Sequence, residues 1–554
     1  MRLFSGVAAY VASLVQLGVS ATSFVVILAA SAAAQSDAVS SALRERVKQA
    51  VQASTDFAAP IHAAIEKHYQ DRSFEPMWHR DGRRTDKATA LLAALRGLTT
   101  DGLEPEDYDV STAERLLDSQ AAVDHARAEF LLTRGLVLAA ADLSTGRVNA
   151  NSIDKEMSPV QRKADYAALL RDGAAHADPK AFFETLMPRG VQYPALKKAL
   201  AEWREKAKTV RYTTVPPVTG LIKPGATDER IAIIRKRLAE TEPDVPAPGP
   251  QGANFYDDQL VAAVKRYQEQ HNLSVDGVIG GKTVASLNIP IEERVQQVVV
   301  NLDRRRWAAE IPGERFVMIN AADYSMYFFD EGKIAFRSRV IVGTPKDQTP
   351  EITSTLVTFQ TNPYWTVPSS IAGEEYLPML RRDPYALQKS NMKIFADWSS
   401  DTELDPGTVD WSTVNPKAFP YRIRQQPGAG NALGYIFFGF QNKYGIYMHD
   451  TSSRFLFGEG SRNFSHGCIR LQNPFGFVEA AFKSSAMKAR VTGVANAGQQ
   501  ASFGFNQPIA IHVTYQTVFA DEAGNVHFRD DVYGRDRKVS AAMKRTRAME
   551  RRSS

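Results

Sequence analysis

The sequence has a single cysteine, Cys468, in 554 residues, so an intramolecular disulfide is impossible. It also lacks a large excess of one charge: the net charge is +5, and residues 535–554 alone hold eight basic and two acidic residues. The rest of the chain is nearly neutral, which excludes an extended basic surface for nucleic acid. With 44% hydrophobic and 23% charged residues, the composition is typical of a soluble globular protein. It argues against a disordered chain or a polytopic membrane protein.

Charged residues are absent between Arg2 and Asp37. Residues 23–30 form an apolar block within this stretch, and small residues follow up to Ala34. That pattern is typical of a secretory signal peptide cleaved after Ala34. The uncharged stretch is also long enough to remain as a membrane anchor. We therefore interpret residues 1–34 as a signal peptide or membrane anchor, and both interpretations place the folded part outside the cytoplasm.

The chain is several times longer than a usual domain, and its apolar spacing changes along its length. Residues 40–215 show helical periodicity, for example at Leu91, Leu95 and Leu98, which predicts a helical scaffold domain. The histidines of this region share no metal-ligand spacing, so we expect ordinary surface or core residues. They are His62, His68, His79, His125 and His176.

Residues 216–290 open with a proline pair and contain two short amphipathic helical patterns and an Asp276-Gly277 turn. Asp257 is a suitable N-cap for the second helix. The stretch resembles the small three-helix peptidoglycan-binding module, and the alternative is a module that only acts as a spacer. We expect a linker helix over residues 291–314 to follow it.

From residue 315 the periodicity is that of β-strands, and residues 315–520 are predicted to form a mainly-β catalytic domain. The predicted strand regions are 316–320, 324–329, 336–343, 356–361, 436–440, 445–449 and 508–518, with a helix near 475–487. Residues 370–430 interrupt this pattern with a loop-rich, aromatic-rich segment. We interpret it as an inserted lid, with a surface insertion folded on itself as the alternative. The fold class expected is multidomain α+β, ending in a C-terminal extension with a basic tail over residues 521–554.

The chemistry gathers around Cys468. A free thiol, with a pKa of about 8.5, is mostly protonated at neutral pH and needs a base to act as a nucleophile. His449 ends a predicted strand, and His466 lies two residues before the thiol. Gly467 leaves room for the backbone N–H groups of Gly467 and Cys468 to aim at an oxyanion. Arg470 offers a guanidinium fork for a carboxylate.

Two other interpretations of these residues remain open. His449, His466 and Cys468 could bind zinc with Asp450 as a fourth ligand, although the C-x-x-C or H-x-x-x-H pairs usual in such sites are missing. Cys468 could also be a buried structural residue beside two incidental histidines.

His449, followed after fifteen residues by Ser465-His466-Gly467-Cys468, is similar to the L,D-transpeptidase signature. Residues 362–371, Leu377-Pro378 and residues 304–307 also resemble the large periplasmic members of that family. The resemblance implies Cys468 as the nucleophile and His449 as the general base, oriented by a backbone carbonyl that Asp450 could supply. It places His466 and Gly467 at the catalytic centre. The substrate-binding residues it suggests are Arg470, Ser465, Tyr447 and Trp365.

The activity implied is acyl transfer through a cysteine thioester. A tetrapeptide stem of peptidoglycan would lose its terminal D-Ala and be joined to a second stem by a 3→3 crosslink, with no metal, cofactor or nucleotide. The alternatives are an L,D-carboxypeptidase, a transferase that attaches a lipoprotein, and a non-catalytic wall-binding scaffold. The expected partners are peptidoglycan stem peptides and glycan. The expected location is the periplasm of a Gram-negative bacterium, with possible attachment to the inner membrane, and the thiol is expected to be a carbapenem target.

Overall fold

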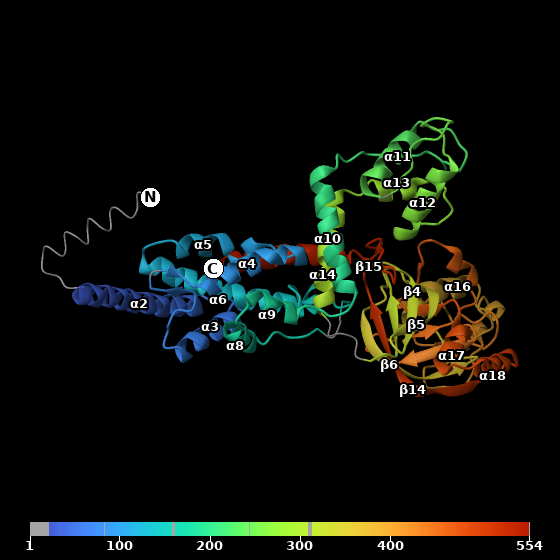
Figure 1. Ribbon diagram of the computed structural model, residues 1–554. Helices are drawn as coiled ribbons and strands as arrows, with labels where there is room; N and C mark the ends of the chain where they lie inside the picture. Colours follow the sequence, from blue (N-terminus) through green and yellow to red (C-terminus); the bar gives the residue numbers. More distant parts are fainter. Residues whose placement is uncertain (1–20, 82, 158–160, 243, 308–312, 553–554) are drawn as a thin grey trace.

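The computed structural model describes residues 21–81, 83–157, 161–242, 244–307 and 313–552. Figure 1 shows an elongated molecule with a helical body at one end, a β domain at the other, and a small helical module beside the β domain. The fold class is multidomain α+β, as predicted. Residues 1–20 of the predicted signal peptide or anchor lie outside the described residues, and residues 21–34 begin the first helix. Among the described helices, none combines the length and apolarity needed to cross a bilayer.

The helical body is built around α6 (Ala122–Thr145), which is buried along most of its length. A helix that is buried on all sides needs neighbours on all sides. They are α2 (Ala21–Gln52), α3 (Ala59–Asp71), α4 (Asp86–Gly97), α5 (Val110–Leu117), α8 (Tyr166–Ala175) and α9 (Pro179–Leu186). Leu91, Leu95 and Leu98 lie in the core they form, as the sequence predicted.

The small module contains α11 (Arg230–Thr241), α12 (Asp258–Gln270) and α13 (Gly281–Leu287). Asp257 caps α12, since its side chain accepts from the N–H of Leu260 at 2.8 Å. The module begins and ends at the same place, because Val215 and Asn288 exchange two hydrogen bonds of 2.9 and 2.8 Å. It is therefore inserted between α10 (Gln192–Thr209) and α14 (Ile291–Trp307), which pack side by side (Figure 1).

The β domain is a barrel. In the described part of the chain its nine-stranded sheet has the order β12-β5-β13-β11-β10-β6-β14-β3-β4, and β4 also pairs with β5, which closes the ring. The strands are β3 (Phe316–Asn320), β4 (Ser325–Asp330), β5 (Lys333–Gly343), β6 (Ile352–Thr361), β10 (Ile436–Phe440), β11 (Met448–His449), β12 (Asn463–Ser465), β13 (Ile469–Leu471) and β14 (Ala501–Thr514).

Two sequence features explain how the barrel forms. Glu331 and Gly332 both have positive φ, which is the backbone of the tight turns that join antiparallel strands, and they connect β4 to β5. Buried and part-exposed residues alternate along β4, as expected for a strand with one face in a core. Phenylalanines fill the inside, and α17 (Pro474–Phe482) and α18 (Ser485–Asn496) cover one face.

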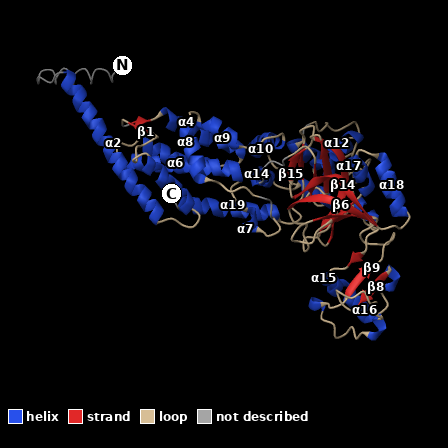
Figure 2. Ribbon diagram, turned by 90° about the horizontal axis from the view of Figure 1, so that it is seen from below, coloured by secondary structure: helices blue, strands red, loops and turns tan. Residues whose placement is uncertain are grey.

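Residues 370–430 are more ordered than a loop-rich segment. Strands β7 (Trp365–Thr366), β8 (Met392–Phe395) and β9 (Arg422–Gln425) form a small sheet, beside the helices α15 (Ser369–Ile371) and α16 (Leu377–Arg382). The segment has its own core, which includes Leu380, Trp411 and Phe419. Figure 2 shows this group standing apart from the barrel. We call residues 365–430 the lid.

The C-terminal extension returns to the helical body. After the hairpin of β15 (Val518–Ala520) and β16 (Val526–Phe528), the chain enters α19 (Arg535–Arg552). This helix packs against α14 and the short helix α7 (Ala150–Ile153), and its end lies near α6 in Figure 1. The residues of the predicted basic tail therefore belong to a helix.

Candidate active site

Parallel pairing of β11 with β13 places the two halves of the sequence motif together. The register matches Met448 with Ile469 and His449 with Arg470, so Cys468 lies next to the start of β11. The backbone N–H and the hydroxyl of Tyr447 both bond to the Cys468 sulfur. A cavity of about 820 Å³ opens here, and its wall includes Trp365, Tyr447, His449, Ser465, His466, Cys468 and Arg470.

His449 is buried and held by the backbone of its neighbour. Its Nδ1 lies 2.5 Å from the carbonyl oxygen of Asp450. A carbonyl can only accept, so Nδ1 carries the proton in the neutral ring and Nε2 has the free lone pair. Burial and the nearby Arg470 lower the pKa of His449 to about 3, against the Asp450 hydrogen bond, which raises it. The ring is therefore a neutral base at pH 7.

The Asp450 side chain forms its hydrogen bonds with residues other than His449. Its carboxylate accepts from the N–H of Tyr435 at 3.0 Å and from Arg454 at 2.8 Å. Asp450 thus orients His449 with its carbonyl, which is the arrangement suggested from the sequence. The carboxylate itself braces the chain around β10.

The Cys468 thiol is also neutral at rest. Burial raises its pKa, although hydrogen bonds from Tyr447 and the charge of Arg470 act in the opposite direction. A neutral thiol beside a neutral imidazole means that attack requires the proton to leave sulfur during the reaction. This differs from a preformed thiolate–imidazolium pair.

Hydrogen bonds within the motif determine which backbone donors are free. Ser465 Oγ accepts from the N–H of Gly467 at 3.1 Å and donates to the carbonyl of Cys468 at 2.5 Å. The sequence suggested that the N–H groups of both Gly467 and Cys468 would face an oxyanion. The structure differs for Gly467, whose N–H is already used, and in the described part of the chain no group accepts from the N–H of Cys468. Ser465 is buried, and its hydroxyl braces the loop from within.

Gly467 itself lies behind the cavity wall, with φ of +103°. A Cβ at this position would lie 2.8 Å from Ile446 Cδ1. The backbone conformation therefore favours glycine, and a larger residue would also have to displace the end of the Ile446 side chain.

His466 faces the lid. Its Nε2 lies 2.8 Å from a carboxylate oxygen of Glu375, and Lys346 reaches the adjacent Glu374 at 2.7 Å. Trp365 packs edge-on against Tyr376, with ring centroids 6.3 Å apart. The sequence did not single out Glu375, because two neighbouring glutamates are typical of any solvent-exposed segment.

Arg470 lies in the cavity wall with its Nε buried and without a hydrogen-bond partner among the described residues. Burial lowers the pKa of its guanidinium, and Cys468 and Glu375 act in the opposite direction. An under-bonded cation at a cavity wall is suited to bind an anionic group. Across the described residues, no group of three or more His, Cys, Asp or Glu side chains is arranged to hold a metal ion.

Three stretches of the chain match known families. Residues 63–200 match the family described as "Scaffold domain", and residues 227–287 match "Putative peptidoglycan binding domain". Residues 314–492 match "L,D-transpeptidase catalytic domain". Most of the barrel, including its thiol, thus lies within the match to the L,D-transpeptidase catalytic domain family.

A curated Haemophilus influenzae protein named "Putative L,D-transpeptidase" is 30% identical over 248 residues, which are 45% of this chain and 49% of that protein. The chain thus spans about half the length of this curated relative. Two solved structures are also similar. They are the L,D-transpeptidase from Xylanimonas cellulosilytica (12% identity, 54% of this chain, 99% of that chain) and the Ldtfm–avibactam carbamoyl enzyme (11%, 57% and 98%). Both have a TM-score of 0.17, too low to support a conclusion about this chain.

The family match to the L,D-transpeptidase domain stops at residue 492, but the barrel does not. β14 supplies a central strand between β6 and β3. The segment after β16 also bonds to the barrel, since the hydroxyl of Tyr533 donates to the carbonyl of Gly343 at 2.8 Å.

Proposed function

We propose that this chain is a peptidoglycan L,D-transpeptidase that forms 3→3 crosslinks through a thioester on Cys468. The observation that carries the proposal is a neutral His449, held at Nδ1 by the Asp450 carbonyl, on the wall of the same cavity as the chain's one thiol. A base with a free Nε2 beside a protonated thiol is suited to nucleophilic acyl transfer.

In the first half-reaction the Cys468 sulfur attacks the carbonyl of the third residue of a tetrapeptide stem, and His449 Nε2 takes the thiol proton. The developing oxyanion is stabilised by the Cys468 N–H, a backbone donor that has no acceptor among the described residues. The C–N bond to the terminal D-Ala then breaks. The proton passes from His449 to the departing amine, and a thioester remains.

In the second half-reaction an amine of a neighbouring stem attacks the thioester carbonyl. The C–S bond breaks, and the proton lost by the amine returns to sulfur through His449. One amide bond replaces another, so the exchange needs no nucleotide. The free Nε2 of His449 can serve both half-reactions because it alternates between accepting and donating the same proton.

Substrate recognition follows from the charges of the cavity wall. Arg470 supplies a cation without a full set of partners, suited to a carboxylate of the stem. Glu375 lies across from it on the lid. Trp365 and Tyr447 provide aromatic surface next to the thiol. The lid would exclude water from the thioester and so favour an amine over hydrolysis.

Two related reactions share the acyl-enzyme: hydrolysis by an L,D-carboxypeptidase, and transfer onto a lipoprotein. The peptidoglycan-binding and transpeptidase domains point to action outside the cytoplasm, and we place the protein in the periplasm. The glycan of the wall is the proposed ligand of the module.

The product of the reaction tests the proposal. The purified protein is incubated with disaccharide-tetrapeptide, and the masses of all products are recorded. We expect free D-Ala together with a dimer joined through the third residues. Tripeptide and D-Ala without dimer would identify a carboxypeptidase, and an unchanged tetrapeptide would contradict the proposal.

A further inference from the structure

A turn behind the catalytic loop is held by an unusual number of hydrogen bonds. Thr349 lies between β5 and β6 and is fully buried. Its hydroxyl donates to the carbonyl of Gly467 at 2.8 Å and accepts from the N–H of Gly343 at 2.9 Å. Thr349 thus joins the end of β5 to the residue just before the thiol.

The C-terminal segment holds the backbone of the same threonine. The Tyr533 hydroxyl donates to the carbonyl of Gly343 at 2.8 Å and accepts from the N–H of Thr349 at 3.3 Å. Arg535 Nη2 donates to the carbonyl of Thr349 at 3.0 Å. The polar groups of Thr349 are therefore all engaged, two of them by residues more than 180 positions away.

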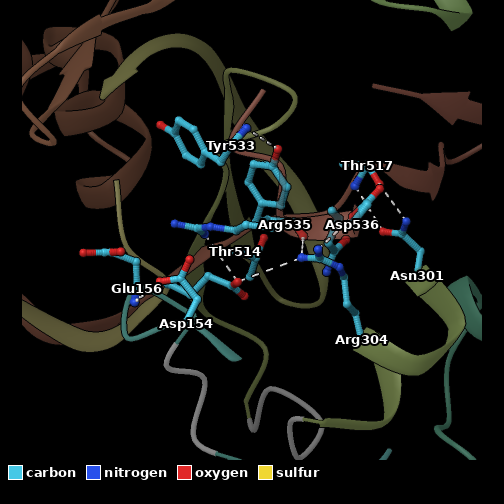
Figure 3. Close-up of polar contacts among 12 residues, drawn as sticks. Asp154, Glu156, Asn301, Arg304, Thr514, Thr517, Tyr533, Arg535 and Asp536 are labelled. Atoms are coloured by element: carbon cyan, nitrogen blue, oxygen red, sulfur yellow. Dashed lines mark hydrogen bonds and ion pairs between the residues drawn. The ribbon is translucent and has the colours of Figure 1, made fainter. Parts of the chain in front are cut away.

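Arg535 and Tyr533 are themselves fixed. Arg535 is fully buried, and its guanidinium lies 4.9 Å from the ring centroids of both Tyr515 and Tyr533. The next residue, Asp536, pairs with Arg304 of α14 at 2.7 Å and accepts from Thr517 at 2.5 Å. Figure 3 shows Tyr533, Arg535 and Asp536 next to one another, with Arg304 and Thr517 reaching Asp536.

The hydrogen bonds of Thr349, Tyr533 and Arg535 together fix the orientation of one peptide plane. The C=O of Gly467 and the N–H of Cys468 belong to the same peptide, which is trans, as are all the described peptide bonds. In a planar trans peptide these two groups point in opposite directions. Fixing the Gly467 carbonyl on Thr349 therefore fixes the direction of the Cys468 N–H, which has no acceptor among the described residues.

We propose that Tyr533 and Arg535, from outside the matched catalytic domain, are positioning residues for acyl transfer: through Thr349 they orient the Gly467–Cys468 peptide and aim its N–H at the oxyanion. The inference rests on the proposed function, since it needs Cys468 to be acylated. It gives the C-terminal extension a role in catalysis through residues 533–536.

The test compares two reactions of the same thiol in the full-length protein. Acylation by a carbapenem, followed by intact mass, passes through an oxyanion, whereas alkylation by iodoacetamide does not. Thr349→Val removes the hydroxyl and keeps the shape. We expect its maximal acylation rate constant to fall about 10- to 100-fold, somewhat less than for loss of an oxyanion donor, with alkylation unchanged. Tyr533→Phe should show the same pattern with a smaller loss, and Thr349→Ser should recover most of the wild-type rate.

Thr361→Val is the matched control. Thr361 is equally buried in the same barrel, and its hydroxyl donates to the carbonyl of Gln499 at 3.0 Å and accepts from the N–H of Ala501 at 3.2 Å. Its acylation rate should match that of the wild type. A wild-type acylation rate in Thr349→Val, or an equal loss of acylation and alkylation, would overturn the positioning role. An adduct that persists in Cys468→Ala would instead overturn the proposed function.

Discussion

The cavity has two walls of different construction. On the barrel side, His449, Ser465 and Thr349 are buried and bonded to backbone groups. On the lid side, Trp365 hydrogen-bonds to Tyr447, and the other polar contacts are between exposed side chains. The His466 and Glu375 side chains are 42% and 49% exposed, and the Lys346 and Glu374 side chains are 71% and 62% exposed. Exposed pairs of this kind contribute about 0–1 kcal/mol each.

The difference separates the parts that must stay fixed from the parts that can move. The barrel wall holds the proposed nucleophile, base and oxyanion donor, where small displacements would lower the rate strongly. The lid has its own core, and we therefore propose that it opens as a unit without unfolding. We therefore expect different roles for the two histidines of the motif, since His449 belongs to the barrel wall and His466 contacts the lid.

The largest effect should come from removing His449, the proposed general base in the barrel wall. His449→Ala should slow acylation roughly 10²–10⁴-fold, because it removes the proton acceptor, whereas His466→Ala should have a much smaller effect. Both variants are compared by their single-turnover acylation rates. A larger loss in His466→Ala than in His449→Ala would exchange the two roles.

The acylation rate of the wild type should also stay nearly constant from pH 8 to 5, because His449, with a pKa of about 3, remains neutral over that range.

Removing the lid should change the ratio of products more than the reactivity of the Cys468 thiol. Replacing most of residues 370–430 by a short Gly/Ser connector should leave Cys468 reactive toward a carbapenem. It should lower crosslinking and raise the share of hydrolysed tripeptide, since water then reaches the thioester. Product masses report the ratio of dimer to tripeptide. A ratio equal to that of the wild type would show that these residues do not act as a lid.

The smallest effect on acyl transfer should come from deleting the module that matches the peptidoglycan-binding domain. The module is remote from the thiol in sequence, and its first and last residues lie next to each other. Because Val215 and Asn288 are directly bonded, a short linker can replace residues 216–287. The variant should keep its activity on soluble muropeptides but sediment less with insoluble sacculi. Sedimentation equal to that of the full-length protein would support the spacer interpretation.

What the sequence could predict depended on how far apart the partners lie along the chain. Cys468 and His449 belong to one short motif, so the sequence alone brings them together. The strands of the lid are two to four residues long, which is too short to show an alternating pattern of apolar and polar residues. Thr349, Tyr533 and Arg535 meet only through tertiary folding, and nothing local distinguishes them from ordinary residues.

The same limit applies to the backbone donors of the motif. The glycine predicted a close approach of the backbone, but a sequence does not show that the Ser465 hydroxyl accepts from the N–H of Gly467. That contact reduces the expected pair of donors to the N–H of Cys468.

The most direct test of the account is the site of the covalent intermediate. Wild-type protein, Cys468→Ala and Cys468→Ser are each mixed with a carbapenem, and intact masses and the modified peptide are determined. We expect one adduct per wild-type chain, on the peptide that contains Cys468, and no adduct on the folded Ala variant. The same mass increase on Cys468→Ala would contradict it.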